Sequence, residues 1–415
     1  MNQDYIKPDK WCIIEEGFDS ENVKSSESIF SIGNGAMGQR ANFEETYTGE
    51  TFQGSYIAGV YYPDKTRVGW WKNGYPEYFA KVLNAPNWIG IKVFVDGVEF
   101  DLATSKKVSG FRRELNMKEG VYTRSFQAVT SNNIEIDVVV KRFLSLDVDE
   151  VGAISYTIKV LKTDATIVFE PYLDSGITNE DSNWDDKFWN TTNVSSENNR
   201  AFIEAHTMKT EFKTCTFMQA SVSYGDKDVS SVPAEKTDNF VSLKFEQNVK
   251  ANESITLTKY GGYTVARNHP KDDLVKVAKN SLSEVSELGF KGLLKKQIAA
   301  WAAIWEMSDI VIKGDIKAQQ GIRFNIFQLN QTYIGTDSRL NIGPKGFTGE
   351  KYGGSTYWDT EAYCIPFYMA TKDDKVARKL LKYRYNHLEK AIENAKKLGF
   401  SNGAALYPMV TMNGE

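Results

Sequence analysis

Residues 346–361 of the 415-residue chain read Gly-Phe-Thr-Gly-Glu-Lys-Tyr-Gly-Gly-Ser-Thr-Tyr-Trp-Asp-Thr-Glu. Four glycines let the backbone approach other groups closely, and aromatic and acidic side chains follow them directly. An aromatic ring can pack on the apolar face of a pyranose, and a carboxylate accepts strong hydrogen bonds from sugar hydroxyls. The stretch therefore indicates a sugar pocket. The structural alternative makes Trp358 a core aromatic and Asp359 a helix cap.

Helical spacing of apolar residues surrounds this stretch. Residues 269–312 are expected to form a helical linker, broken near Gly289 or Gly292. A second helix is predicted from Ile322, Ile326, Leu329 and Tyr333. A third, capped by Asp373 or Asp374 and ended by Gly399, is predicted from Leu381, Tyr385, Leu388 and Ile392.

Upstream of the linker, apolar residues alternate with a period of two. Asp96-Gly97 supplies a two-residue hairpin turn. The further strand-like runs cover 121–129, 134–146, 151–161, 166–173, 211–222, 240–245 and 255–260. So many short strands without intervening helices predict a large antiparallel β-sandwich over residues 1–268.

Residues 178–200 interrupt this alternation with Asp, Asn and Ser together with Trp184, Phe188 and Trp189. The pattern is typical of a long surface loop. The functional alternative is that its aromatic residues pack against a partner subunit or help to line the pocket.

The run 33–38, Gly-Asn-Gly-Ala-Met-Gly, satisfies the pattern of a dinucleotide-binding loop. The residues after it have no apolar helical stripe, which that motif requires. A glycine-rich turn between strands is therefore expected, and no nucleotide cofactor.

Composition excludes several functions. The chain has 50 basic and 54 acidic residues without a basic stripe, so neither nucleic acid nor an anionic membrane is an expected partner. No apolar run approaches the roughly 20 residues of a membrane span, and the polar start lacks a signal region. A cytoplasmic protein is predicted. Three scattered cysteines and three scattered histidines predict neither a disulfide framework nor a metal site.

The stretch 346–361 resembles the Gly-Leu-Thr-Gly-x-x-Tyr-x-Gly-x-x-Phe-Trp-Asp-Thr-Glu signature of glycoside hydrolase family 65, differing mildly at Phe347 and Tyr357. The turn at 33–38 is also similar to one in that family. The resemblance implies an α+β multidomain fold. Residues 1–268 would form the sandwich, 269–312 the helical linker and 313–415 the beginning of an (α/α)6 catalytic barrel.

The resemblance also implies roles for single residues. Asp359 would accept hydroxyls of the glucosyl unit at the cleavage point, and Trp358 would form the wall beside it. Phe324 is a candidate for the pocket floor, with core packing as its alternative. Glu361 is interpreted as a structural carboxylate, because the family places its general acid elsewhere.

The resemblance further implies inverting phosphorolysis of an α-linked glucose disaccharide, with inorganic phosphate as co-substrate and no cofactor. Maltose is the first expectation; trehalose, kojibiose, nigerose or a hydrolytic relative are alternatives. The family's general acid and phosphate-binding motifs would follow Glu415, so no catalytic residue is assigned, and this chain alone is expected to be inactive. A non-catalytic carbohydrate-binding module is the alternative of a different class. The full-length parent is expected to be a homodimer.

Overall fold

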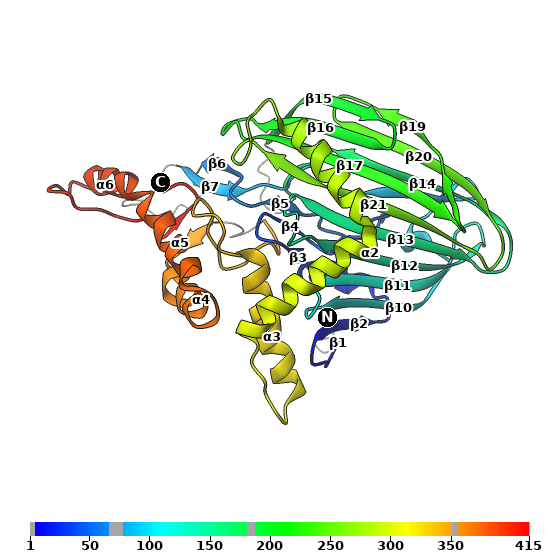
Figure 1. Cartoon of the computed structure of the whole chain (residues 1–415), viewed down its shortest axis with the longest axis horizontal. Coiled ribbons are helices and arrows are strands. Elements are labelled where there is room, and N and C mark those ends of the chain that lie inside the picture. The colour runs from blue at the N-terminus through cyan, green and yellow to red at the C-terminus, as the bar shows by residue number, and fades with distance from the viewer. Residues whose placement is uncertain (1–4, 66–77, 181–186, 351–354, 415) are drawn as a thin grey trace.

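The computed structural model describes residues 5–65, 78–180, 187–350 and 355–414. Its larger part is a sandwich of antiparallel strands, and its smaller part consists of helices joined to the sandwich by a long helix (Figure 1). The predicted fold class, α+β with an N-terminal antiparallel sandwich followed by helices, is confirmed. The assignment of 313–415 to an (α/α)6 barrel and the boundaries at 268 and 312 stay predictions.

An 11-stranded antiparallel sheet forms one layer of the sandwich. In spatial order its strands are β1 (Ile6–Lys7), β2 (Cys12–Glu16), β10 (Lys107–Asn116), β11 (Val121–Val129), β12 (Glu135–Leu144), β13 (Val151–Val160), β21 (Ser254–Val265), β17 (Lys213–Tyr224), β16 (Arg200–Thr207) and β15 (Trp189–Glu197), with β18 (Lys227–Val229) paired to β17.

A five-stranded sheet forms the second layer, in the order β19 (Ser231–Lys236), β20 (Phe240–Val249), β14 (Ala165–Asp174), β8 (Ile91–Val95) and β9 (Val98–Glu99). Ile91, Val93 and Val95 alternate with half-buried residues and point into a core shared by both sheets. The predicted hairpin at Asp96-Gly97 joins β8 to β9. Both turn residues have positive φ, 48° and 76°, as a type I′ turn requires.

The glycine run at 33–38 forms a turn between β3 (Ile32–Gly33) and β4 (Met37–Gln39), and β5 (Ser55–Ile57) pairs with β4. The predicted turn between strands is confirmed. Asn34 closes it: its side-chain oxygen accepts from the backbone N–H of Ala36 and Met37 at 3.1 and 2.9 Å. A separate two-stranded ribbon, β6 (Tyr61–Lys65) with β7 (Tyr78–Val82), extends toward the helical part (Figure 1).

The expectation of a surface loop over 178–200 is wrong for its second half. Residues 189–197 are the edge strand β15, and Phe188 and Trp189 are buried in the sandwich core. Trp189 also donates its indole N–H to the carbonyl of Asn84 at 2.8 Å. Because an edge strand is paired on one side only, most of its side chains are polar and the apolar alternation is lost. Trp184 lies outside the described residues.

Helix α2 (Leu274–Ser308) covers the outer face of the large sheet (Figure 1). Its predicted break occurs at Gly289, whose φ of 66° and ψ of 168° are not helical. Leu274, Leu282 and Leu293 bury one apolar face against Phe143 and Phe217 of the sheet.

The remaining helices are α1 (Val23–Ile29) in the sandwich region and, after α2, α3 (Ile316–Thr332), α4 (Ile365–Thr371), α5 (Asp374–Tyr385) and α6 (Leu388–Lys397). The single helix expected up to Gly399 is wrong, since it is divided into α5 and α6 at Asn386 and His387. Its predicted cap holds, because Asp373 accepts from the backbone N–H of Lys375 at 2.9 Å. No helix among the described residues is both long enough and apolar enough to cross a bilayer.

Candidate functional site

Trp358 and Asp359 occupy the connection between β22 (Thr356–Tyr357) and a π-helical turn, Thr360–Cys364, that leads into α4. The Trp358 side chain is 53% exposed, so it is not a core aromatic. Asp359 is exposed and makes no capping hydrogen bond through its side chain. Neither packing nor capping therefore occupies these two side chains, and both are available to a ligand.

The backbone on each side of the pair is anchored. Upstream, β22 pairs with β23 (Val410–Thr411). Downstream, the buried Thr360 hydroxyl donates to the carbonyl of Ile342 at 2.7 Å. Two exposed side chains are thus presented from a fixed backbone, as a preorganised binding surface requires.

Glu361 forms a bidentate ion pair with Arg384 of α5, with N–O distances of 2.8 and 3.1 Å. The Nη1 atom of Arg384 also donates to the carbonyl of Pro408 at 3.3 Å, and Pro408 lies just before β23. Arg384 therefore connects the Trp358–Asp359 turn to the strand that pairs with β22. This arrangement agrees with the interpretation of Glu361 as a structural carboxylate.

Cys364 ends the π-helical turn and reports on the charge around it. Burial, followed by the negative charges of Asp359 and Glu361, raises the pKa of the Cys364 thiol to about 11. The thiol is therefore protonated at neutral pH and is a poor nucleophile.

The glycine-rich loop that precedes the pair rests on the sandwich. Phe347 is buried and packs directly over Gly33 and Gly38 of the β3–β4 turn. A Cβ atom at Gly38 would lie 2.1 Å from the Cβ of Phe347, so only glycine fits there. Arg40 adds a hydrogen bond from its guanidinium to the carbonyl of Thr348. Residues 351–354 of the motif lie outside the described residues.

Phe324 is half-buried on α3 and lines a cleft of about 550 Å³ beneath this loop. It also packs against the main hydrophobic core, so both predicted roles have a structural basis. The cleft is completed by Arg40, Phe52, Gln328, Gly346 and Glu350, among others.

Of the three predicted site residues, only Phe324 is among the described residues that line this cleft, whereas Trp358 and Asp359 are not. Their joint action on a sugar stays a prediction. Among the described residues, no cluster of three or more His, Cys, Asp or Glu side chains could hold a metal ion.

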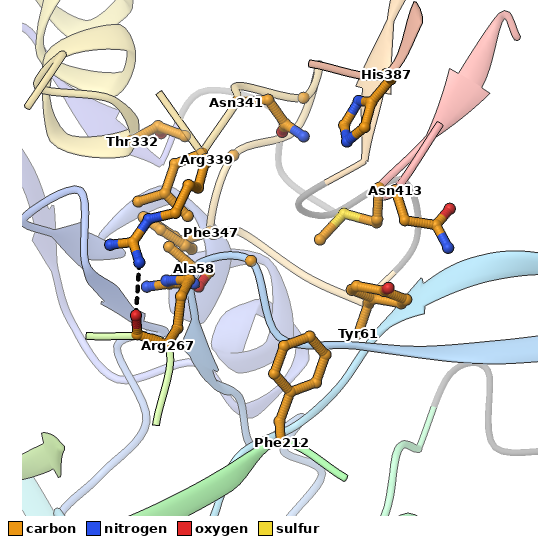
Figure 2. A pocket seen from close by; sticks show the side chains of 15 residues that line it. Ala58, Tyr61, Phe212, Arg267, Thr332, Arg339, Asn341, Phe347, His387 and Asn413 are labelled. Carbon is orange, nitrogen blue, oxygen red and sulfur yellow. Dashed lines mark hydrogen bonds between the residues drawn. The ribbon is translucent and has the colours of Figure 1, made fainter. Parts of the chain in front are cut away.

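A second cavity, of about 220 Å³, lies where β6, the loop before residue 347 and the α5–α6 break meet (Figure 2). Its lining includes the polar side chains of Arg267, Arg339 and His387 and the aromatic rings of Tyr61 and Phe212. Sequence reasoning missed this cavity because its residues come from segments far apart in the chain. His387 lines the cavity because α5 and α6 are separated at this point, and the sequence has neither Pro nor Gly there to predict the separation.

Comparison with known proteins identifies the family. The profile of "Glycosyl hydrolase family 65, N-terminal domain" matches residues 13–304, and that of "Glycosyl hydrolase family 65 central catalytic domain" matches residues 323–415. Maltose phosphorylase of Bacillus subtilis (strain 168) is 44% identical, with 100% of this chain and 54% of the relative covered. Alpha,alpha-trehalose phosphorylase of Thermoanaerobacter brockii is 33% identical, with coverage of 97% and 53%.

A solved structure with the provisional name kojibiose phosphorylase, from the human microbiome, superposes with a TM-score of 0.89 at 31% identity. The superposition covers 99% of this chain and 53% of the other. The chain thus spans about half the length of the relatives it matches. With both domain profiles matched over most of its length, the chain belongs to glycosyl hydrolase family 65.

Proposed function

We propose that this chain belongs to an inverting disaccharide phosphorylase that converts maltose and phosphate to β-glucose 1-phosphate and glucose. Trp358 forms a wall against the glucosyl ring, Asp359 accepts its hydroxyls and Phe324 contributes to the pocket floor. The observation that carries the proposal is the Trp358–Asp359 pair, whose side chains are exposed and uncommitted on an anchored backbone.

Similarity favours maltose among the possible substrates. Maltose phosphorylase of Bacillus subtilis is 44% identical to this chain, against 33% for the trehalose phosphorylase and 28% for a kojibiose phosphorylase of Thermoanaerobacter brockii. Trehalose, kojibiose and nigerose remain the alternative substrates for the same pair of residues.

Inverting cleavage requires an acid that protonates the leaving oxygen and a nucleophile on the opposite face of the ring. Phosphate is already an anionic nucleophile, so one protein carboxyl group is sufficient. Glu361 does not suit this task, because both of its carboxylate oxygens accept hydrogen bonds from the Arg384 guanidinium. We therefore assign no catalytic acid to these 415 residues and propose that they bind sugar without turning it over.

Replacing Asp359 tests the assignment. We expect Asp359→Ala to weaken glucose or maltose binding about tenfold to a hundredfold, because it removes charge-assisted hydrogen bonds. In the full-length parent it should lower turnover by orders of magnitude. Binding is measured by isothermal titration calorimetry and the fold by circular dichroism.

Asp226→Asn, at an exposed turn of the sandwich, is the matched control and should bind as the unchanged protein does. For the aromatic wall, Trp358→Ala is compared with Tyr363→Ala, whose ring is 74% exposed one helical turn later. Unchanged binding in Asp359→Ala would remove Asp359 from the pocket.

A non-catalytic carbohydrate-binding module is the second candidate. It is favoured by the ion pair of Glu361 with Arg384, because that pair leaves no free carboxyl group beside Asp359 to act as an acid. It is distinguished by assaying the chain with maltose and phosphate. Binding without phosphate-dependent glucose release favours the module or the binding half of an enzyme, whereas release at an ordinary enzymatic rate contradicts our proposal that these residues do not turn sugar over.

A further inference from the structure

Arg40 lies directly after β4, and its guanidinium is buried where the sandwich meets the glycine-rich loop. Its Nε donates to the carbonyl of Phe52 at 2.8 Å, and its Nη2 donates to the carbonyl of Lys24 in α1, also at 2.8 Å. Its Nη1 donates to the carbonyl of Thr348 in the loop. One buried side chain thus joins two segments of the sandwich to the loop that precedes the candidate sugar site.

The sandwich itself holds this guanidinium in place. Its Nη2 lies 3.5 Å from a carboxylate oxygen of Glu27, whose side chain is also buried. The same carboxylate accepts from the hydroxyl of Thr51 and, at 2.8 Å, from the backbone N–H of Phe52. The guanidinium also lies over the Phe52 ring, 4.7 Å from its centroid. Since a paired and stacked arginine has little freedom left, Nη1 is presented to the loop in a fixed position.

Thr348 presents its carbonyl to Arg40 from a tight turn. Its backbone N–H and its hydroxyl both donate to the carbonyl of Lys345, at 3.2 and 2.8 Å. A charged donor bonds such a carbonyl more strongly than a neutral donor does. Two residues later, the buried Glu350 carboxylate accepts from the backbone N–H of Glu180 at 2.9 Å. Arg40 and Glu350 thus attach the loop to the sandwich at two points.

The start of the loop is tied to the candidate sugar site. The carbonyl of Ile342 accepts at 2.7 Å from the hydroxyl of Thr360, the residue after Asp359. The middle of the loop packs closely against α3, since a Cβ atom at Gly346 would lie 2.4 Å from the hydroxyl oxygen of Thr332. A displacement of this packed loop is therefore transmitted to the backbone beside Asp359.

We propose that Arg40 is a positioning residue for the sugar site. Its hydrogen bond to Thr348 sets the position of residues 342–350, and the contact of Ile342 with Thr360 passes this position on to Asp359. The inference rests on the proposed function, in which Asp359 accepts hydroxyls of the glucosyl ring. Arg40 acts through the loop and not by contact with the ring, so its removal should loosen the loop before any sugar is present.

Hydrogen exchange of the sugar-free protein tests the first step. In Arg40→Ala we expect the backbone amides of residues 342–350 and 356–361 to exchange about threefold to tenfold faster, because a charge-assisted hydrogen bond to the loop is lost. Strand β20 lies in the other sheet, between β19 and β14, and its amides should exchange at an unchanged rate.

Sugar affinity tests the second step. Arg40→Ala should bind maltose about threefold to tenfold more weakly in isothermal titration calorimetry. Arg40→Lys keeps the positive charge without the guanidinium fork and should recover part of the affinity. Arg112→Ala is the matched control, because Arg112 pairs with Glu16 and Glu114 on the sandwich surface, and it should bind maltose as the unchanged protein does.

Added guanidinium ion distinguishes positioning from a general loss of stability. Arg40→Ala leaves a space beside the Glu27 carboxylate and the carbonyls of Phe52, Lys24 and Thr348, and a free guanidinium ion at low millimolar concentration should occupy it. Both the maltose affinity and the slow exchange of the loop should then return. Sodium chloride at the same ionic strength should restore neither.

Unchanged exchange of residues 342–350 in Arg40→Ala would overturn the proposal, and so would equal acceleration in β20, which would show general loosening. Weaker maltose binding without faster exchange would place Arg40 in contact with the sugar and would also overturn it. Where Arg40→Ala does not fold, Arg40→Lys carries the same two comparisons. If the unchanged protein binds no maltose, the proposed function fails, whereas the exchange comparison still decides whether Arg40 positions the loop. The two failures are thus distinguished.

Discussion

At the scale of single residues, Trp358 and Asp359 are set by backbone anchors rather than by packing of their own side chains. Thr356 and Thr360 on either side are buried, while the pair between them is exposed. The buried threonines fix the backbone, so the Trp-Asp pair can face solvent in a protein whose other large aromatic residues are mostly buried. It also means that substitutions at the pair should change binding more than stability.

Cys364 gives a chemical measure of the charge on Asp359. Since that charge contributes to the raised thiol pKa of about 11, Asp359→Asn should lower the pKa and increase the thiolate fraction. We expect faster alkylation of Cys364 by iodoacetamide at mildly alkaline pH, followed by peptide mass spectrometry.

Cys12 is the internal control in the same digest. Its thiol pKa is raised to about 12 by burial and by Glu114 and Asp9, which the substitution does not touch. Equal acceleration of both cysteines would indicate loosening of the whole protein, and no change at Cys364 would place the Asp359 charge farther from the thiol than the structure has it.

At the scale of elements, Arg384 joins three segments: the π-helical turn through Glu361, α5 itself, and the approach to β23 through Pro408. Arg384→Met leaves Glu361 without its cation and should destabilise the protein by about 1–3 kcal/mol. Hydrogen exchange should accelerate in 356–361 and 408–412, where β22 pairs with β23. Arg378→Met, an exposed site on the same helix, should change neither the free energy of unfolding nor the exchange.

Replacing each of the two glycines of α2 by alanine should change the free energy of unfolding in opposite directions. Gly289 has a φ of 66° and a ψ of 168°, a region nearly restricted to glycine, so Gly289→Ala should cost about 1–3 kcal/mol. Gly292 is helical, and a Cβ there meets Leu288 only at an ordinary 3.4 Å, so Gly292→Ala should stabilise by about 0.5–1 kcal/mol. Urea unfolding measures the stability of both variants. Equal destabilisation by Gly289→Ala and Gly292→Ala would contradict a kink at Gly289.

These elements also show what sequence patterns can predict. β11 was bounded correctly at Val121–Val129 because its buried face alternates with period two. β10, β15, β16 and β19 were not predicted; in β19 nearly every side chain is exposed, so no alternation exists to detect. The α5–α6 break could not be predicted, because neither Pro nor Gly marks it; in the structure His387 stands at the break, with its ring against that of Tyr383.

The candidate site divides in the same way. Trp358 and Asp359 could be proposed because they are consecutive in a recognisable motif. The cavity at the α5–α6 break could not, since Arg267, Asn341 and His387 meet only after the sandwich and the helices have docked. The spacing of residues in the sequence predicts sites that lie on one segment. It does not predict sites formed by residues from distant segments.

At the scale of the whole molecule, the sandwich and the helical part share a hydrogen-bonded seam. Gly35 donates its backbone N–H to the carbonyl of Gln331 in α3 at 2.8 Å, and the Gln331 side chain donates to the carbonyl of Ser31 at 3.2 Å. In the middle of α3, Arg323 donates to the carbonyl of Lys10 at 2.9 Å. The helix that bears Phe324 is therefore positioned by the first strands of the sandwich.

The contact of Gly38 with Phe347 tests this dependence of the site on the sandwich. Gly38→Ala places a methyl group where the Phe347 side chain lies, and overpacking of this kind costs about 1–3 kcal/mol. Because Phe347 belongs to the loop before Trp358, sugar affinity should fall together with stability. Phe347→Ala removes the obstacle but leaves a cavity, so alone it should cost about 3–5 kcal/mol.

Combining Gly38→Ala with Phe347→Ala should cost less than the sum of the two changes, by about 0.5–3 kcal/mol, because the new methyl group occupies space that the ring has left. Urea unfolding of the four proteins gives this coupling energy, and calorimetry with maltose shows whether affinity recovers with it. Gly97→Ala, in a sandwich turn where an added Cβ has no neighbour within 4 Å, should affect stability by backbone strain alone and leave sugar affinity unchanged. Additive costs would mean that the loop does not rest on the β3–β4 turn, and the sandwich would then have no part in shaping the sugar site.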